Sequence, residues 1–300
     1  MKQLNPISKV SFLLIFLSSI FYYSCSKDRI QKKQLNQYSS PNTYLDSKKQ
    51  QEQTFVIDTS GSGPIIGNQG TKIWIGKQCL MFPNGDSVTW PFTVKLVELY
   101  KPKDMIYYQM PTVVSSSGIL KTDGEIRLRA FKNGTELLLK PNPCMAQIEM
   151  PCAAPQNGMH VFYGLTTNNL PDWTDSPLTL FSTNPASYTA SITKLGWINC
   201  GLQAGSSSNS TLSFTSTTDD LTNVAFFIYF PSTKTVMQAY NEASGQIPNG
   251  SAVKIIAIAV DGSGQLYSFY QTQTVNASAA IDVVMTATSD GSLTTLLDGL

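Results

Sequence analysis

An all-β fold is predicted by the amino-acid sequence, arranged as two β-sandwich-like domains that follow an N-terminal tether. From residue 55 onward the chain consists of short β-like runs, some of them with alternating apolar and polar residues, separated by Gly, Pro, Asn and Asp. This is the pattern of β-strands joined by turns. No long segment repeats its apolar residues every 3.6 positions, as an amphipathic helix would. Charged residues make up only 14% of the chain, too few for a coiled coil and usual for an exported β protein.

The first 24 residues have the layout of a secretory signal peptide. Lys2 and Lys9 supply positive charge, and residues 10–23 form an apolar run broken only by serines. This run is too short to span a bilayer comfortably, which takes about 20 apolar residues. Ser24 is small, as a cleavage site requires. Residues 1–24 are therefore predicted to be a signal peptide.

Cys25 follows this cleavage site directly, and the segment SCSKD (residues 24–28) resembles the lipobox of bacterial lipoproteins of the Bacteroidetes type. The resemblance implies that the chain is cut before Cys25 and that this cysteine is then acylated. It also implies a location at the outer membrane, with the protein facing the periplasm or the cell surface. Tyr22 stands where the commoner lipobox has leucine. The alternative is an ordinary signal peptide followed by a coincidental cysteine.

Residues 25–54 are predicted to form an acylated, disordered tether. This stretch is rich in Lys, Gln, Asn and Ser and has few large apolar side chains, so it offers little surface to bury on folding. Each lipid methylene that enters the membrane contributes about 0.8 kcal/mol, so several acyl chains make a stable anchor.

Residues 55–204 hold the strands expected for the first domain. The clearest hairpin lies at 124–141, where Asn133-Gly134 suits a two-residue turn because both central residues need positive φ. Residues 168–177, NNLPDWTDSP, are predicted to be a loop by their Asn, Pro and Asp content. The other expected strands are TKIWI (71–75), DSVTWPFTVKLVELY (86–100), MAQIEMP (145–151), GMHVFYGL (158–165) and SYTASITKLGWINCG (187–201).

Residues 211–300 are predicted to form a second β-sandwich that ends in a short amphipathic helix at 292–300. The Gly/Ser-rich segment 202–210 separates it from the first domain. Six strand-like runs within about ninety residues have the spacing that a small sandwich needs. They are TLSFTST (211–217), VAFFIYF (224–230), TVMQAY (235–240), SAVKIIAIAVD (251–261), QLYSFYQTQTV (265–275) and AAIDVVMTAT (279–288).

The segment 70–151 resembles the ZU5-like module of Bacteroidetes lipoproteins. The matching positions are Phe82-Pro83, Val88-Thr89, Pro91, Thr93-Val94, Leu96, Glu98, Asp104-Met105-Ile106, Pro111-Thr112, Gly118, Thr122, Gly124, Ala130 and Asn133-Gly134. LGWINCG (195–201) is similar to a further segment of the same proteins, although Gly201 stands where they usually have Asp. The resemblance implies an all-β module at 55–204, used in adhesion and scaffolding and without catalytic residues.

Four cysteines follow Cys25, namely Cys79, Cys144, Cys152 and Cys200. In an oxidising compartment they permit two disulfides with three possible connectivities. The predicted strand between Cys144 and Cys152 would hold its ends about 26 Å apart if straight, beyond the reach of a disulfide. Pairing with Cys79 and Cys200 is therefore expected; a bent strand or four free thiols are the alternatives. No CxxC pair indicates zinc, and no metal site is predicted.

Trp173, Tyr107 and Tyr108 are the residues that the sequence marks for ligand contact. Trp173 falls in the predicted loop, and the two tyrosines are adjacent. Exposed aromatic rings stack on sugars or anchor a protein partner. The other three tryptophans, Trp74, Trp90 and Trp197, are expected in the core.

Catalysis has little support in the sequence, so no enzyme activity and no cofactor are expected. His160 is the only histidine, and no G-x-S-x-G nucleophile motif accompanies it. A glycosidase would need two facing carboxylates, which sequence alone cannot pair. The candidates would be Asp104, Glu125, Glu136, Glu149, Asp172 and Asp175.

The near balance of 21 basic and 20 acidic residues gives no strong field to attract nucleic acid. The leading hypothesis is a lipid-anchored, non-enzymatic binding or structural module of the cell envelope. Its expected partners are the membrane, through the anchor, and a glycan or another envelope protein. The alternative is a carbohydrate-binding or carbohydrate-processing lipoprotein of a glycan-uptake system.

Overall fold

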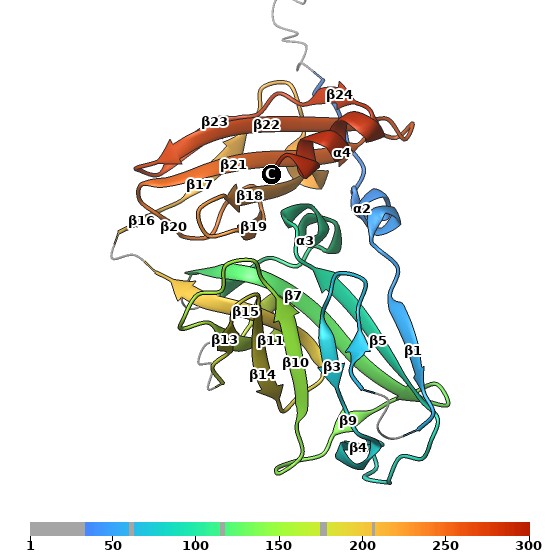
Figure 1. Ribbon diagram of the computed structural model, residues 1–300. Helices are drawn as coiled ribbons and strands as arrows, with labels where there is room; N and C mark the ends of the chain where they lie inside the picture. The colour runs from blue at the N-terminus through green and yellow to red at the C-terminus, as the bar shows by residue number, and fades with distance from the viewer. Residues whose placement is uncertain (1–33, 60–62, 115–117, 175–178, 206–207) are drawn as a thin grey trace, which may run out of the picture. The chain divides into compact units, whose positions relative to one another are not determined.

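The computed structural model describes residues 34–59, 63–114, 118–174, 179–205 and 208–300. It is mostly β, with 51% strand and 11% helix, which confirms the all-β prediction. Residues Asn36–Leu300 form one compact unit, to which the following description applies (Figure 1). The predicted signal peptide and Cys25 lie outside the described residues.

An eight-stranded sheet is the largest element of this unit. Its main path runs β1-β5-β7-β15-β11-β12, and β6 and β8 pair with β7. The predicted hairpin is the β7–β8 turn, where Asn133 and Gly134 have φ values of 51° and 80°. The strands are β1 (Gln53–Ile57), β5 (Phe92–Leu99), β6 (Val113–Val114), β7 (Gly118–Lys132), β8 (Thr135–Glu136), β11 (His160–Thr167), β12 (Leu170–Trp173) and β15 (Gly196–Ala204).

A five-stranded sheet, ordered β13-β14-β10-β3-β2, packs against the inner face of the eight-stranded sheet. Its strands are β2 (Ile65–Ile66), β3 (Lys72–Trp74), β10 (Ala146–Pro151), β13 (Ser182–Asn184) and β14 (Ser187–Ile192). Leu96, Ile126 and Ile198 from one sheet meet Ile73 and Ile148 from the other in a shared core. Beside this core, η1 (Lys77–Cys79) leads into β4 (Leu80–Met81), which pairs with β9 (Leu138–Leu139).

The C-terminal half contains a second five-stranded sheet, ordered β19-β18-β21-β22-β24. Its strands are β18 (Ala225–Phe230), β19 (Thr235–Ala239), β21 (Ser251–Val260), β22 (Leu266–Val275) and β24 (Thr286–Thr288). The strand pairs β16 (Asn209–Ser210) with β20 (Ile247–Pro248), and β17 (Leu212–Thr215) with β23 (Ala279–Asp282), accompany it; η2 (Leu221–Asn223) precedes β18. The six strand-like runs predicted for this half therefore all contain strands.

Both faces of β18 are buried, and this places the C-terminal sheet between two cores. Phe226, Ile228 and Phe230 point into the core of the C-terminal half. Phe227 and Tyr229 point the other way, into a cluster that also holds Val97 and Leu99 from β5. Side chains alternate between the faces of a strand, so one strand serves two cores.

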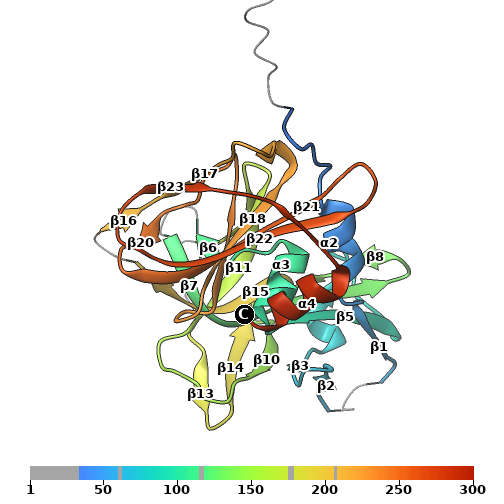
Figure 2. The same ribbon diagram turned by 90° about the horizontal axis from the view of Figure 1, so that it is seen from above.

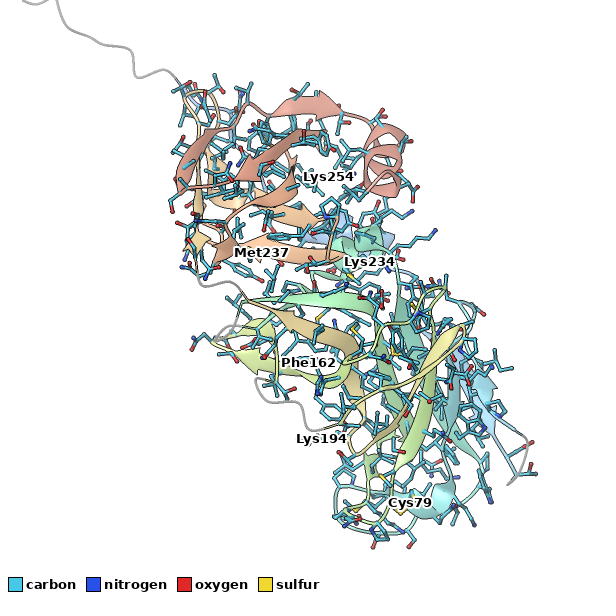
Figure 3. The ribbon with its side chains drawn as sticks, turned by 60° about the vertical axis from the view of Figure 1, so that its left-hand side comes forward. Cys79, Phe162, Lys194, Lys234, Met237 and Lys254 are labelled. Carbon is cyan, nitrogen blue, oxygen red and sulfur yellow. A yellow bond between two sulfur atoms is a disulfide. The ribbon has the colours of Figure 1, made fainter. Side chains whose placement is uncertain are left out.

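Three short helices complete the cluster between the two halves, α2 (Asn42–Lys48), α3 (Pro102–Tyr108) and α4 (Asp290–Asp298). α3 lies against both α2 and α4 (Figure 2). The ion pair Lys103–Asp298, at 2.5 Å, joins α3 to the C-terminal helix. Elsewhere between the halves, Lys234, which is labelled in Figure 3, donates through Nζ to Asp123 Oδ1 at 2.7 Å. The helix expected at the C-terminus is present, whereas α2 and α3 were not expected.

Part of the segment predicted as a disordered tether is ordered. Asn36 forms a bridge with Asp219, and Ser39 forms one with Val260. The side chains of Tyr38 and Leu45 are buried, with exposures of 6% and 0%. Because residues 34–54 are mostly polar, the sequence did not indicate that these two side chains would be buried. Their burial fixes the segment against the folded unit. Residues 25–33 lie outside the described residues.

Candidate ligand-binding face

Trp173 is not available at the surface, contrary to the sequence-based prediction. It lies in strand β12 instead of a loop, opposite Gly164 of β11, and its side chain is fully buried. Its indole Nε1 donates to the carbonyl of Pro111 at 2.7 Å. The ring therefore fills the cluster between the halves, and ligand stacking on it is ruled out in this structure.

The two candidate tyrosines differ in position although they are adjacent. Tyr107 is 4% exposed and packs in the cluster between the halves. Tyr108 ends α3, is only half-buried, and donates its hydroxyl to the carbonyl of Gln50 at 2.6 Å. Of the three residues predicted for ligand contact, Tyr108 alone reaches the surface.

Tyr108 belongs to a group of half-buried cations and aromatic rings on the outer face of the eight-stranded sheet. We call this group the cation–aromatic face. Its members are Lys49, Lys95, Tyr108, Arg127, Arg129, Phe131 and Trp197. One side of β5 carries Lys95, Val97 and Leu99. Val97 and Leu99 are covered by α3 and the C-terminal sheet, whereas Lys95 is not part of that buried cluster. The face is thus the uncovered part of a surface that is otherwise buried.

Arg127 and Trp197 form the centre of the face. They are direct cross-strand neighbours on β7 and β15, and the guanidinium carbon lies 5.6 Å from the indole centroid. Guanidinium groups stack favourably on indole at this distance. Gly164 on the next strand makes room for the ring, because a Cβ there would come within 2.5 Å of the Trp197 Cβ.

Tyr108 and Lys49 continue this stack on the side of α3. The Tyr108 ring meets Trp197 edge-on, with centroids 5.8 Å apart, and Lys49 Nζ lies 5.4 Å from the Tyr108 centroid. Partial burial and the charge of Glu52 raise the pKa of Tyr108 to about 12, against an opposing effect of Arg127. The phenol is therefore neutral at physiological pH, and Glu52 and Arg127 both act on it electrostatically.

In a second row of the face, around Phe131, the cations are paired with carboxylates. Arg129 and Lys95 lie 5.0 and 5.2 Å from the Phe131 centroid. Arg129 binds Glu52 through three hydrogen bonds of 2.6–3.0 Å, and Lys95 reaches the same carboxylate at 3.4 Å. Although partial burial raises the pKa of Glu52, the bonds from Arg129 and the two positive charges hold it below its usual value.

Arg127 differs from the other cations of the face in lacking a carboxylate. Lys49 pairs with Asp46 at 2.6 Å, and Lys95 and Arg129 share Glu52. Within the ranges that the structure describes, no ion pair involves Arg127. The positive charge that remains on the face is therefore concentrated at its centre.

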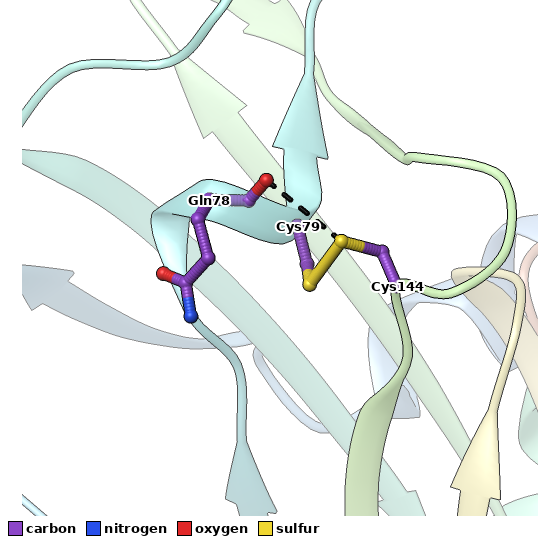
Figure 4. The surroundings of a disulfide bond; sticks show 3 residues. All are labelled: Gln78, Cys79 and Cys144. Atoms are coloured by element: carbon purple, nitrogen blue, oxygen red, sulfur yellow. Dashed lines mark hydrogen bonds between the residues drawn. A yellow bond between two sulfur atoms is a disulfide. The ribbon is translucent and has the colours of Figure 1, made fainter.

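Among the four cysteines that the structure describes, one pair is joined. Cys79 and Cys144 form a disulfide with a Cα–Cα distance of 5.1 Å that closes a separation of 65 residues (Figure 4). Cys144 is thus joined to a cysteine distant in sequence and not to Cys152, which strand β10 separates from it. Cys152 and Cys200 are free thiols, so the second expected disulfide is absent from this structure.

The carboxylates considered for glycosidase chemistry lie on different elements. Glu125 is fully buried in β7, where burial raises the pKa of its carboxyl despite a hydrogen bond from Asn199 Nδ2 at 3.1 Å. Glu149 of β10 pairs with Lys72 at 2.9 Å. Asp104 is in α3, and Asp175 lies outside the described residues. In the part of the chain with known placement, no group of three His, Cys, Asp or Glu is arranged to hold a metal.

Sequence reasoning missed the two central residues of the face. Trp197 was expected in the core, and Arg127 carried no motif. The alternation Arg127-Leu128-Arg129 in β7 indicates a polar face, but only the pairing of β7 with β15 places Trp197 beside it.

Comparison with known proteins finds no matching family, no matching curated protein and no matching solved structure. Across the residues that the structure describes, no helix has both the length and the apolar character needed to cross a membrane.

Proposed function

We propose that the protein is a lipid-anchored, non-enzymatic binding module of the cell envelope, and that the cation–aromatic face is its ligand-binding surface. The observation that carries the proposal is the set of half-buried side chains Tyr108, Trp197 and Arg127 on the outer face of the eight-stranded sheet. Aromatic and Arg side chains are enriched where proteins bind partners. The anchor part of the proposal comes from the resemblance of residues 24–28 to a lipobox.

The second candidate function, a carbohydrate-binding lipoprotein, is favoured by the same rings. Half-buried aromatic rings offer apolar surface with polar neighbours, the combination that suits a sugar ring. The ZU5-like resemblance of 70–151 favours the alternative of adhesion or scaffolding through a protein partner.

Two measurements test the proposal. Cys25→Ala should move the protein from the membrane fraction to the soluble fraction. An unchanged distribution would contradict a lipid anchor at Cys25. The soluble variant, fluorescently labelled, should bind to isolated cell envelopes in a saturable manner.

Arg127→Gln combined with Tyr108→Ala should weaken envelope binding at least tenfold, about 1.4 kcal/mol. Lys194→Gln is the matched control (Lys194 is labelled in Figure 3), because Lys194 also lies over an aromatic ring, Tyr163, but Tyr163 packs against the inner core. Equal binding by all three proteins would exclude the face as the binding surface.

A further inference from the structure

We infer that the ligand of the cation–aromatic face is an acidic polysaccharide, and that Arg127 binds its carboxylate or sulfate groups. This inference rests on the proposed function and names its ligand class. It follows from two features of the face, the uncompensated guanidinium at its centre and the aromatic rings beside it.

The charge distribution selects an anion. Each other cation of the face already has a carboxylate within 4 Å, whereas Arg127 has none among the described residues. The Arg127 guanidinium lies over the Trp197 ring, with its carbon atom 5.6 Å from the ring centroid. No hydrogen bond from the Arg127 side chain is found within the described part of the chain. A guanidinium with free donors in a fixed fork matches carboxylate and sulfate oxygens.

The rings select a sugar in preference to an acidic peptide. The row runs from Arg127 through Trp197 and Tyr108 to Lys49. The guanidinium carbon lies 5.6 Å from the Trp197 centroid, the two ring centroids are 5.8 Å apart, and Lys49 Nζ lies 5.4 Å from the Tyr108 centroid. An acidic polysaccharide carries apolar ring faces between its charges, so it can cover the two rings while its acid pairs with Arg127. An Asp or Glu side chain offers the acid but no ring face.

The binding partners for the test are pairs of polymers that differ only in charge. Polygalacturonate carries carboxylates, and carboxyl-reduced polygalacturonate is its neutral match. Dextran sulfate carries sulfates, and dextran is its neutral match. Poly-glutamate is an acidic chain without sugar rings. Binding of the full-length Cys25→Ala protein to each is measured by titration calorimetry at low and at physiological salt.

The inference expects at least tenfold tighter binding of an acidic polysaccharide than of its neutral match, with affinity falling as salt rises. Whether polygalacturonate or dextran sulfate binds more tightly distinguishes carboxylate from sulfate recognition. Arg127→Gln should reduce this binding at least tenfold. Arg127→Lys, which keeps the charge and most of the packing, should recover only part of it because it lacks the planar fork. Lys194→Gln should bind like the parent protein.

Other outcomes overturn the inference in distinguishable ways. Equal binding of neutral and acidic polymers, or full binding by Arg127→Gln, would remove Arg127 from recognition and leave the proposed function standing. Poly-glutamate binding as tightly as the polysaccharides would indicate an acidic protein ligand. If no polymer binds, the glycan inference fails, while the envelope-binding measurement above decides the proposed function separately. The thermal unfolding temperature of each variant is compared with that of the parent protein. Equal temperatures show that a loss of binding does not come from unfolding.

Discussion

Asp219 shows how one residue fixes a segment that the sequence marks as disordered. Its carboxylate accepts hydrogen bonds from Asn36 at 2.9 Å and from the Tyr38 hydroxyl at 2.6 Å. It also accepts the Thr218 hydroxyl at 2.6 Å and the backbone N–H of Met285 at 3.2 Å. Burial raises the pKa of Asp219, but these hydrogen bonds to the charged form bring the net pKa below its usual value.

Asp219→Asn is expected to lower the free energy of unfolding by about 1–3 kcal/mol at pH 7, because the groups that donate hydrogen bonds to this carboxylate lose a charged acceptor. A carboxyl whose folded pKa is depressed stabilises the fold above its unfolded pKa, about 3.9, and loses this effect as pH falls through the folded pKa. The difference between parent and variant should therefore be largest above pH 5 and shrink towards pH 3.

Urea unfolding at several pH values measures this difference. Asp282→Asn, at an exposed position of β23, is the control and should change stability little. A difference independent of pH would show that the Asp219 charge does not hold the segment.

Gly164→Ala tests whether Gly164 positions Trp197 in the cation–aromatic face. The new Cβ would lie 2.5 Å from the Trp197 Cβ, so the strands must shift or the ring must move. We expect a loss of about 1–3 kcal/mol in the free energy of unfolding and a changed tryptophan emission spectrum. Gly262→Ala, where nothing lies within 4 Å, should alter neither. An unperturbed Gly164→Ala protein would mean that Gly164 does not position Trp197.

At the scale of secondary structure, the strands were the predictable part. In β10 the alternation of apolar and polar residues marks a strand with one buried face. The continuous apolar runs of β18 and β21 mark strands that are buried on both faces. Asn133-Gly134 predicted its turn because few residues adopt positive φ twice in succession.

The helices α2 and α3 and the strand β12 were not predictable on the same basis. Each helix spans seven residues, too few to show a 3.6-residue period. β12 carries Pro171 and Asp172, which read as loop residues, and its pairing with β11 overrides that preference. The cation–aromatic face depends on cross-strand neighbours, which a single sequence does not reveal.

The sulfur chemistry of the strands gives a further prediction. In the Cys25→Ala protein, denatured without reductant, two thiols should react with a chromogenic disulfide reagent, and four after reduction, because only Cys79 and Cys144 are joined. In the native protein half-buried Cys152 should react first. Cys200 should lag, since burial raises its pKa and blocks access. No reactive thiol in the denatured, unreduced protein would instead indicate a second disulfide between Cys152 and Cys200.

At the scale of the whole unit, three buried clusters determine how the halves depend on each other. One lies between the two sheets of the N-terminal half, and one lies mainly within the C-terminal half but also includes Ile119 of β7. The third contains side chains from both, among them Leu99, Trp173, Phe227 and Leu293. Removing either half would expose this third cluster to water, so the halves are coupled by apolar burial.

We therefore expect the unit from Asn36 onward to unfold in one cooperative transition. All four tryptophans belong to the N-terminal half, and Trp173 also lies in the third cluster, so their fluorescence reports on the N-terminal half and on its contact with the C-terminal half. Far-UV circular dichroism reports on the strands of both halves. The two signals should coincide along a urea gradient with the disulfide intact. Phe227→Ala, in the C-terminal half, should cost about 3–5 kcal/mol and should shift the tryptophan transition together with the dichroism.

Leu165→Ala is the control for this variant, because Leu165 is 47% exposed; both transitions should stay in place. If Phe227→Ala left the tryptophan transition unmoved while the dichroism split into two steps, the halves would be independent domains, as the sequence predicts for 55–204 and 211–300. In that case the third cluster would be a contact between folded parts, and the face beside it would keep its geometry even when the C-terminal half unfolds.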